Sequence, residues 1–147
     1  RVSKLRVERL GDGAGMIEAD VCTLAGRGEK GMVNGPPGDA KFCYPHDTAA
    51  FRFNDMDVVL VCDFDNNCIR RVFMFNGEAE NVTCWAGSST GEAGFKDGKV
   101  ADALFNHPGG VAVSSGGEAV FVADTYNHCI RMIYRDEDGL WQVTTIA

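Results

Sequence analysis

The segment with the greatest potential for chemistry is Asp124-Thr125-Tyr126-Asn127-His128, which brings a carboxylate, a phenol, an amide and an imidazole into five residues. Such groups can serve acid–base catalysis or hold a metal ion. The same pattern occurs 61 positions earlier, however, so that two copies share an ordered set of residues: Asp63, Asn66, Ile69 and Arg70 in the first, and Asp124, Asn127, Ile130 and Arg131 in the second. Because an enzyme seldom repeats its catalytic groups, we interpret these residues as framework. We expect each Asp to cap its turn and each Arg to pair with a carboxylate near a sheet edge.

The repeat extends well beyond these turns. Residues 21–26 (VCTLAG) match residues 82–87 (VTCWAG), and residues 40–42 (AKF) match residues 103–105 (ALF). The first pair is offset by 61 positions and the second by 63, which indicates a two-residue insertion between the copies. Self-similarity at a fixed period is typical of repeat architectures.

Each copy contains four short runs rich in β-branched and aromatic residues, separated by polar turns. They predict strands at 49–53, 58–62, 68–75 and 82–86, then at 110–113, 119–123, 129–134 and 141–146, with two earlier strands at 5–10 and 17–25. Four consecutive strands with tight turns form an antiparallel meander, and repeated meanders are the blades of a β-propeller. We therefore expect an all-β fold with about two and a half blades: residues 1–26 end one blade, and residues 27–87 and 88–147 form the next two.

Residues 122–133 (VADTYNHCIRMI) resemble the NHL repeat, which is named after an Asn-His-Leu triplet. Asn127 and His128 keep the first two letters and Cys129 replaces the Leu, whereas the earlier copy reads Asn-Asn-Cys at 66–68. The resemblance implies a propeller of typically six blades. Either this chain is a fragment of a larger parent, which we favour, or several chains assemble one ring. An open propeller exposes apolar blade faces and unpaired strands, and we expect self-association.

Two further motifs invite an enzymatic interpretation. Residues 26–31 fit G-x-G-x-x-G and residues 87–91 fit G-x-S-x-G, but both motifs need a following helix, and the sequence predicts inter-blade loops instead. The three histidines, His46, His107 and His128, lack metal-binding spacing. We expect no metal and no other cofactor. The alternative is enzymatic. The peptide-amidating lyases, an enzymatic branch with propellers of this type, hold zinc with histidines, so the alternative function is that of a metal-dependent lyase or hydrolase.

Charge and composition narrow the choice of partner. The chain carries a formal charge of −7, and the turns and long loops, which strand alternation places on one face, hold five basic against nine acidic residues. This balance disfavours nucleic acid, and with it the RNA binding of one NHL branch. No apolar run is long enough for a membrane helix, so no membrane partner is expected. Six cysteines without a C-x-x-C pair favour free thiols and a reducing, cytoplasmic location.

These observations favour a non-enzymatic scaffold for protein–protein interaction. Long loops on one face of a repeat are the usual place for binding residues. The candidate binding residues are those of the loops and turns on that face: Arg27, Lys30, Phe95, Lys96, Tyr126 and His128.

Overall fold

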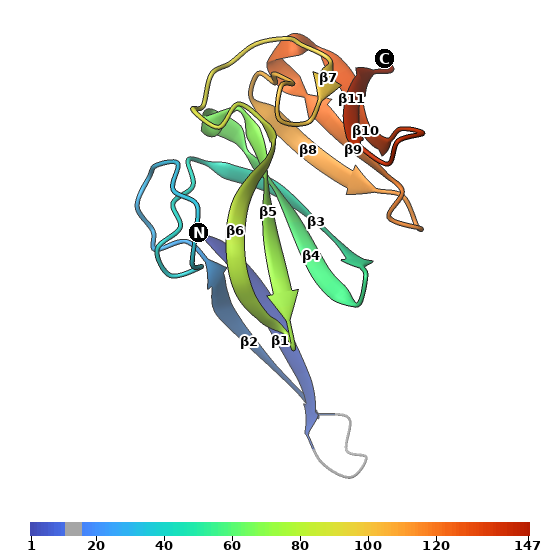
Figure 1. The fold of residues 1–147 in the computed structure, drawn as a ribbon. Coiled ribbons are helices and arrows are strands. Elements are labelled where there is room, and N and C mark those ends of the chain that lie inside the picture. The colour runs from blue at the N-terminus through green and yellow to red at the C-terminus, as the bar shows by residue number, and fades with distance from the viewer. Residues whose placement is uncertain (11–15) are drawn as a thin grey trace.

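The computed structural model describes residues 1–10 and 16–147 and contains three antiparallel sheets arranged side by side (Figure 1). The first sheet pairs β1 with β2, the second has the order β3-β4-β5-β6, and the third has the order β7-β11-β10-β9-β8. Their bounds are β1 Val2–Leu10, β2 Met16–Ala25, β3 Pro45–Phe53, β4 Met56–Asp63, β5 Cys68–Phe75, β6 Glu78–Gly87, β7 Gly98–Lys99, β8 Pro108–Val113, β9 Ala119–Asp124, β10 Cys129–Arg135 and β11 Trp141–Thr145. The all-β fold and the repeated four-stranded meanders are confirmed.

Short 3-10 helices replace simple turns at equivalent places in the repeat. Helix η1 (Phe64–Asn66) joins β4 to β5, and η2 (Thr125–Asn127) joins β9 to β10. Each ends on a left-handed residue with φ of 54°, Asn67 in the first copy and His128 in the second. None of the helices in the described residues is long and apolar enough to span a membrane.

Strand β7 is an element that the sequence does not predict. It pairs with the outer strand β11, and the register places Gly98 opposite Val143. In the first copy Gly35 forms an equivalent bridge to Val82 of β6. The long loops are therefore tied to the outer strand in both copies, by backbone hydrogen bonds that place no demand on side-chain type.

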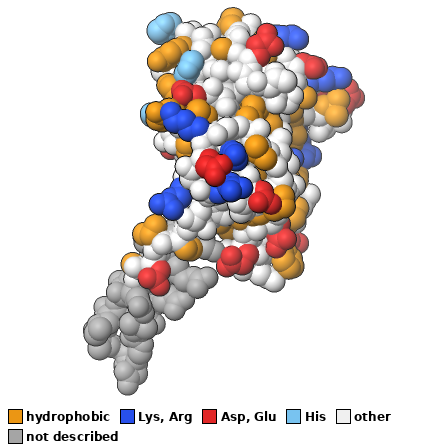
Figure 2. Space-filling view, turned by 90° about the vertical axis from the view of Figure 1, so that its left-hand side faces the viewer, with side chains coloured by type: hydrophobic (Ala, Val, Ile, Leu, Met, Phe, Trp, Pro, Cys, Tyr) orange, Lys and Arg blue, Asp and Glu red, His pale blue; other side chains and the backbone are white. Residues whose placement is uncertain are grey.

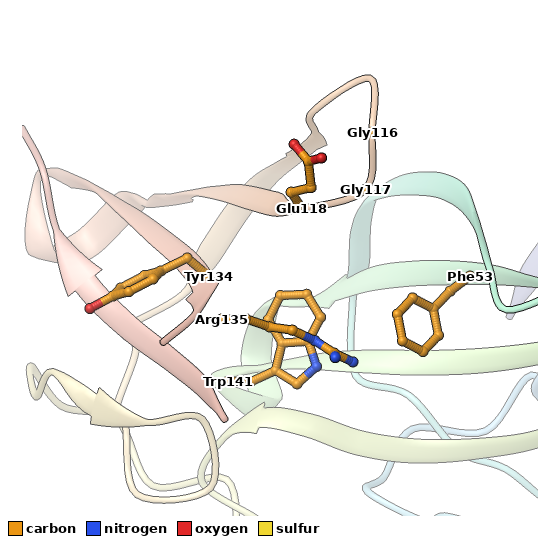
Figure 3. A pocket seen from close by; sticks show the side chains of 7 residues that line it. All are labelled: Phe53, Gly116, Gly117, Glu118, Tyr134, Arg135 and Trp141. Carbon is orange, nitrogen blue, oxygen red and sulfur yellow. The ribbon is translucent and has the colours of Figure 1, made fainter. Parts of the chain in front are cut away.

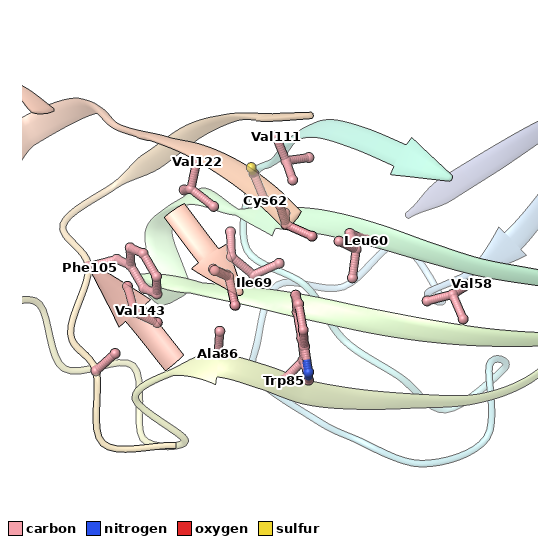
Figure 4. Close-up of a cluster of buried hydrophobic side chains, with 13 residues drawn as sticks. Val58, Leu60, Cys62, Ile69, Trp85, Ala86, Phe105, Val111, Val122 and Val143 are labelled. Carbon is pink, nitrogen blue, oxygen red and sulfur yellow. The ribbon is translucent and has the colours of Figure 1, made fainter. Parts of the chain in front are cut away.

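The apolar core is divided between two interfaces that repeat the same positions. In the first, Val61, Val72 and Val82 of the β3–β6 sheet pack with Leu24 and Ala25 of β2. In the second, the equivalent residues Val122, Ile133 and Val143 pack with Trp85 and Ala86 of β6, as Figure 4 shows in part. A loop phenylalanine joins each interface, Phe42 in the first and Phe105 in the second. The β3–β6 sheet thus buries one face against the β1–β2 sheet and the other against the last sheet.

The last sheet shows what happens when no described sheet covers the second face. Leu60 and Ile69 are fully buried by the following sheet, and Trp85 is almost fully buried. Their counterparts 61 positions later are Phe121, Ile130 and Ile146, which are 36%, 37% and 48% exposed. Side chains of the same apolar character therefore differ in burial only because of their neighbours.

This difference predicts contrasting effects of two equivalent substitutions. Leu60→Ala should lower the free energy of unfolding by about 2–5 kcal/mol because it opens a cavity in a closed interface. Phe121→Ala should lower it by less than about 1 kcal/mol because the ring is partly exposed already. Chemical denaturation of both variants measures the contrast, and equal losses would contradict the assignment of Leu60 to an interface between sheets.

Candidate functional site

Each repeated turn is held by a buried ion pair. Asp63 and Arg70 are fully buried, and Nη1 of Arg70 donates to Oδ2 of Asp63 at 2.7 Å. Asp124 and Arg131 form the same pair at the same distance. A buried charge requires a partner and further hydrogen bonds, because desolvation otherwise makes it strongly unfavourable. The expected pairing of each Arg with a carboxylate is confirmed. The expected position near a sheet edge is wrong, because Arg70 and Arg131 lie on the interior strands β5 and β10.

The expectation that each Asp caps its own turn is wrong. Neither Asp makes a side-chain capping bond to its 3-10 helix. Instead, Oδ1 of Asp63 accepts the backbone N–H of Cys43 at 2.7 Å, and Oδ1 of Asp124 accepts that of Asn106 at 2.8 Å. Burial raises the pKa of Asp63, while hydrogen bonds from Asn66, Cys43 and Arg70 act in the opposite direction. The carboxylate therefore connects the turn to the end of the preceding long loop.

The guanidinium groups connect the turns to the rest of the long loops. Arg70 donates to the carbonyl oxygens of Lys41 and Val33 at 3.0 and 2.8 Å. Arg131 donates to those of Leu104 and Lys96 at 3.0 and 2.7 Å. These bonds confirm that turns and long loops lie on one face. They also show that Lys96, a candidate binding residue, contributes its backbone to the framework.

A cluster of rings joins the two complete blades on this face. We call His46, Phe64, His107 and Tyr126 the turn cluster. The His107 ring stacks on Tyr126 with centroids 4.3 Å apart, and Phe64 contacts His46, His107 and Tyr126 at 5.2, 4.9 and 5.8 Å. The backbone N–H of His107 also donates to Oδ1 of Asn67 at 2.9 Å. The cluster is therefore anchored from both blades.

The six candidate binding residues fall into separate groups. Arg27 lies 3.4 Å from Glu29, and Lys30 donates to the Tyr44 hydroxyl at 2.9 Å. Phe95 and Lys96 surround Arg131, whose guanidinium lies 5.0 Å from the centre of the Phe95 ring. Tyr126 belongs to the turn cluster. The remaining candidate, His128, occupies the left-handed position that ends η2.

The backbone restricts which residue types fit at the position of His128. Its counterpart Asn67 has the same left-handed backbone and binds Gly91 and His107 of the following blade through its side chain. A left-handed backbone restricts the residue types that fit, and His and Asn are among those that tolerate it. The position therefore has a structural constraint in both copies.

Sequence reasoning missed His46, Phe64, Tyr44 and His107 as surface-forming residues. Tyr44 and His107 precede the proline of equivalent loops and have φ of 51° and 53°, so the pattern of a ring before proline was the available signal. Phe64 had no signal, because Thr125 takes its place in the other copy.

The turn cluster brings two imidazoles together with the rings of Phe64 and Tyr126. One nitrogen of each imidazole already faces a nearby oxygen: Nδ1 of His46 lies 2.9 Å from the Gly109 carbonyl, and Nδ1 of His107 lies 2.8 Å from Oδ1 of Asn106. Within the described residues, no group of three His, Cys, Asp or Glu side chains could hold a metal ion. Figure 2 shows histidines beside hydrophobic side chains at one end, with basic and acidic side chains interspersed elsewhere on that face.

Asp97 accepts hydrogen bonds from Arg131 at 3.1 and 2.6 Å. The contribution of this contact to stability can be tested by changing the pH. Burial raises the pKa of Asp97, but hydrogen bonds from the Thr145 N–H and from Arg131 outweigh it, so the pKa is lowered overall. Its stabilising effect is then complete above the ordinary pKa of 3.8 and is lost as the pH falls through the lower value of the folded state. Asp97→Asn copies Asn34 of the first repeat, which accepts from Arg70 at 2.9 Å.

We expect Asp97→Asn to lower the free energy of unfolding at pH 7 by less than about 1 kcal/mol, because the Asp97 side chain is 45% exposed. The difference from the unmodified chain should shrink below about pH 4 as Asp97 becomes protonated. Urea denaturation at pH 7, 5 and 3 measures it. If the difference in unfolding free energy between the two chains grows towards low pH, ionised Asp97 does not stabilise the fold through Arg131.

Comparison with known proteins adds a sequence match within the last sheet. The NHL repeat matches residues 105–132, which cover β8, β9, η2 and the start of β10. The chain is 49% identical over 45 residues to Protein SUPPRESSOR OF QUENCHING 1, chloroplastic, from Arabidopsis thaliana, covering 31% of this chain and 4% of that protein. It is 46% identical over 55 residues to NHL repeat-containing protein 2 from Gallus gallus, covering 37% of this chain and 7% of that protein.

Solved structures extend the likeness to nearly the whole chain. An auxiliary nutrient binding protein from Bacteroides ovatus matches with a TM-score of 0.66 and 21% identity, covering 97% of this chain and 32% of that one. A protein of the same description from Bacteroides thetaiotaomicron matches with a TM-score of 0.62 and 23% identity, covering 96% and 32%. The chain thus spans about a third of these structures and less than a tenth of the curated relatives. It contains an NHL repeat, and its fold is that of part of a β-propeller.

Proposed function

We propose that this chain is a non-enzymatic scaffold that binds a protein partner through the face carrying the turns and long loops. The observation that supports the proposal is the pair of exposed rings on that face: Tyr126 is 55% exposed and Phe95 is 61% exposed. Tyr and Arg are enriched among the residues that dominate binding at protein interfaces, and rings lose little conformational entropy on binding.

The rigidity of the framework favours binding as well. Tyr126 stacks on His107, and the Arg131 guanidinium packs against Phe95 while it is fixed by Asp124. Side chains that are already ordered lose less freedom when a partner docks. The acidic excess of the chain supports a protein in preference to a nucleic acid as the partner. Self-association through the exposed apolar residues of the last sheet would use a different surface.

Photo-cross-linking tests the proposed face even while the partner is unidentified. p-Benzoylphenylalanine replaces Tyr126 in one variant and Leu140, which lies in the β10–β11 turn at the opposite end of the sheet, in another. Both positions are exposed, so the two probes are matched in accessibility. In cells that make the protein, we expect partner proteins to be captured at position 126 and not at position 140.

A second measurement separates binding from folding. Once a partner is captured, Tyr126→Ala should weaken its affinity at least fivefold, which corresponds to about 1 kcal/mol, while Leu140→Ala leaves affinity unchanged. Circular dichroism should show both variants folded. Capture at position 140 alone, or equal effects of the two substitutions, would refute the proposed face.

A further inference from the structure

An aromatic cavity lies at the opposite ends of the blades, between the β3–β6 sheet and the last sheet. It has a volume of about 160 Å³ and is lined by Phe51, Phe53, Met56, Val58, Arg71, Phe73, Trp85 and Trp141. An adjoining hollow of about 280 Å³ shares Phe53 and Trp141 with it. Figure 3 shows Phe53 facing Trp141 and Arg135 across this outer hollow, from a different sheet. Because both sheets contribute walls, the cavity exists only where the two blades meet.

The walls of the aromatic cavity are ordered by ring and guanidinium contacts. Trp85 and Trp141 meet edge to face, with centroids 5.3 Å apart and planes at 82°. The Arg71 guanidinium lies 4.3 Å from the centre of the Phe73 ring, and that of Arg135 lies 5.0 Å from Trp141. Such contacts hold a cation in place without neutralising its charge. The cavity is thus a preformed apolar space with a fixed positive charge in its wall.

Two residues that line the cavity each carry a buried donor without an acceptor among the described residues. Nε of Arg71 and Nε1 of Trp85 are buried without a hydrogen-bond partner there, and the Trp85 side chain is more than nine-tenths buried. Buried donors are normally satisfied, so each unsatisfied one calls for an explanation. Among the residues that the structure describes, no carboxylate lies within ion-pair distance of Arg71, whereas its neighbour Arg70 pairs with Asp63. Burial also lowers the pKa of Arg71, because the charged form is poorly solvated there.

Glu118, the acidic residue of the adjoining hollow, does not serve as the counter-ion of Arg71. Glu118 lines that hollow with Arg135 and is absent from the wall of the aromatic cavity. Among the described residues that line the cavity, Arg71 alone carries a charge, and this charge sets the preference of the site. The complementary group is an anion that can accept two hydrogen bonds, such as a carboxylate.

We propose that the aromatic cavity binds a small carboxylate with an aromatic body, the ring entering between Trp85, Trp141 and Phe51 and the carboxylate accepting from Arg71 and Trp85. A cavity of about 150 Å³ lined by apolar side chains accommodates a benzene ring, so the volume suits a single ring. The site is distinct from the turn cluster, because it lies at the other end of the sheets. It does not depend on the proposed scaffold function.

Three probes with one ring and different charges test the proposal: phenylacetate, phenylacetamide and phenethylamine. Trp85 and Trp141 are the two tryptophans of the chain and both line the cavity, so intrinsic fluorescence reports directly on it. We expect phenylacetate to bind with a Kd on the order of 0.1 mM, given its few atoms, and at least tenfold more tightly than the amide. The amine should bind most weakly. In NMR spectra, phenylacetate should shift the Trp85 indole proton.

Arg71→Met and Arg52→Met form a matched pair of variants. Both remove one positive charge from the same blade, but Arg52 is exposed, lies 3.6 Å from Asp57 and does not line the cavity. We expect Arg71→Met to abolish the preference for phenylacetate over phenylacetamide, and Arg52→Met to preserve it. If Arg71→Met does not fold, the ranking of the three probes in the unmodified chain decides alone. Equal binding of acid and amide, no saturable fluorescence change, or identical behaviour of both variants would overturn the proposal.

Discussion

The buried ion pair between Asp63 and Arg70, repeated as Asp124 and Arg131, is the interaction on which the rest of the structure depends. Each pair lies at the point where a turn, a long loop and the third strand of a meander meet. Removing one partner of such a pair leaves an uncompensated buried charge, which is strongly destabilising. Arg70 donates four hydrogen bonds, to the carbonyl oxygens of Lys41 and Val33, to Oδ1 of Asn34 and to Oδ2 of Asp63. These bonds fix the positions of the loop segments that accept them. A loop with few apolar residues becomes ordered in this way.

The apolar interfaces complement this polar anchor. Val61 and Val122 are buried against the preceding sheet, whereas Leu60 is buried against the following one. A strand with both faces covered loses the alternation of apolar and polar residues that marks a half-exposed strand. This explains why β4 is apolar over five consecutive positions, 58–62.

The internal repeat made most of the fold predictable from the sequence, because each copy confirms the strand assignments of the other. What could not be predicted are contacts between residues far apart in the chain whose partners are backbone atoms. The bonds from Arg131 to the Lys96 and Leu104 carbonyls leave no trace in side-chain type, and neither does the pairing of β7 with β11. The position of Tyr126 on the loop face could be expected from strand alternation. Its stacking on His107 could not, because the two side chains come from different segments.

The two copies also serve as an internal control that separates framework from function. Positions that bind the loop or the turn keep their residue type: Asp63 and Asp124, Asn66 and Asn127, Arg70 and Arg131, Phe42 and Phe105. Positions in both candidate surfaces differ between the copies. Phe64 corresponds to Thr125 and Tyr126 to Asp65 in the turn cluster; Arg71 corresponds to Met132 and Trp141 to Glu80 at the aromatic cavity. A fold that needed these side chains would need them in every blade. Their occurrence in one copy only means that the blade forms without them, which leaves them available for binding.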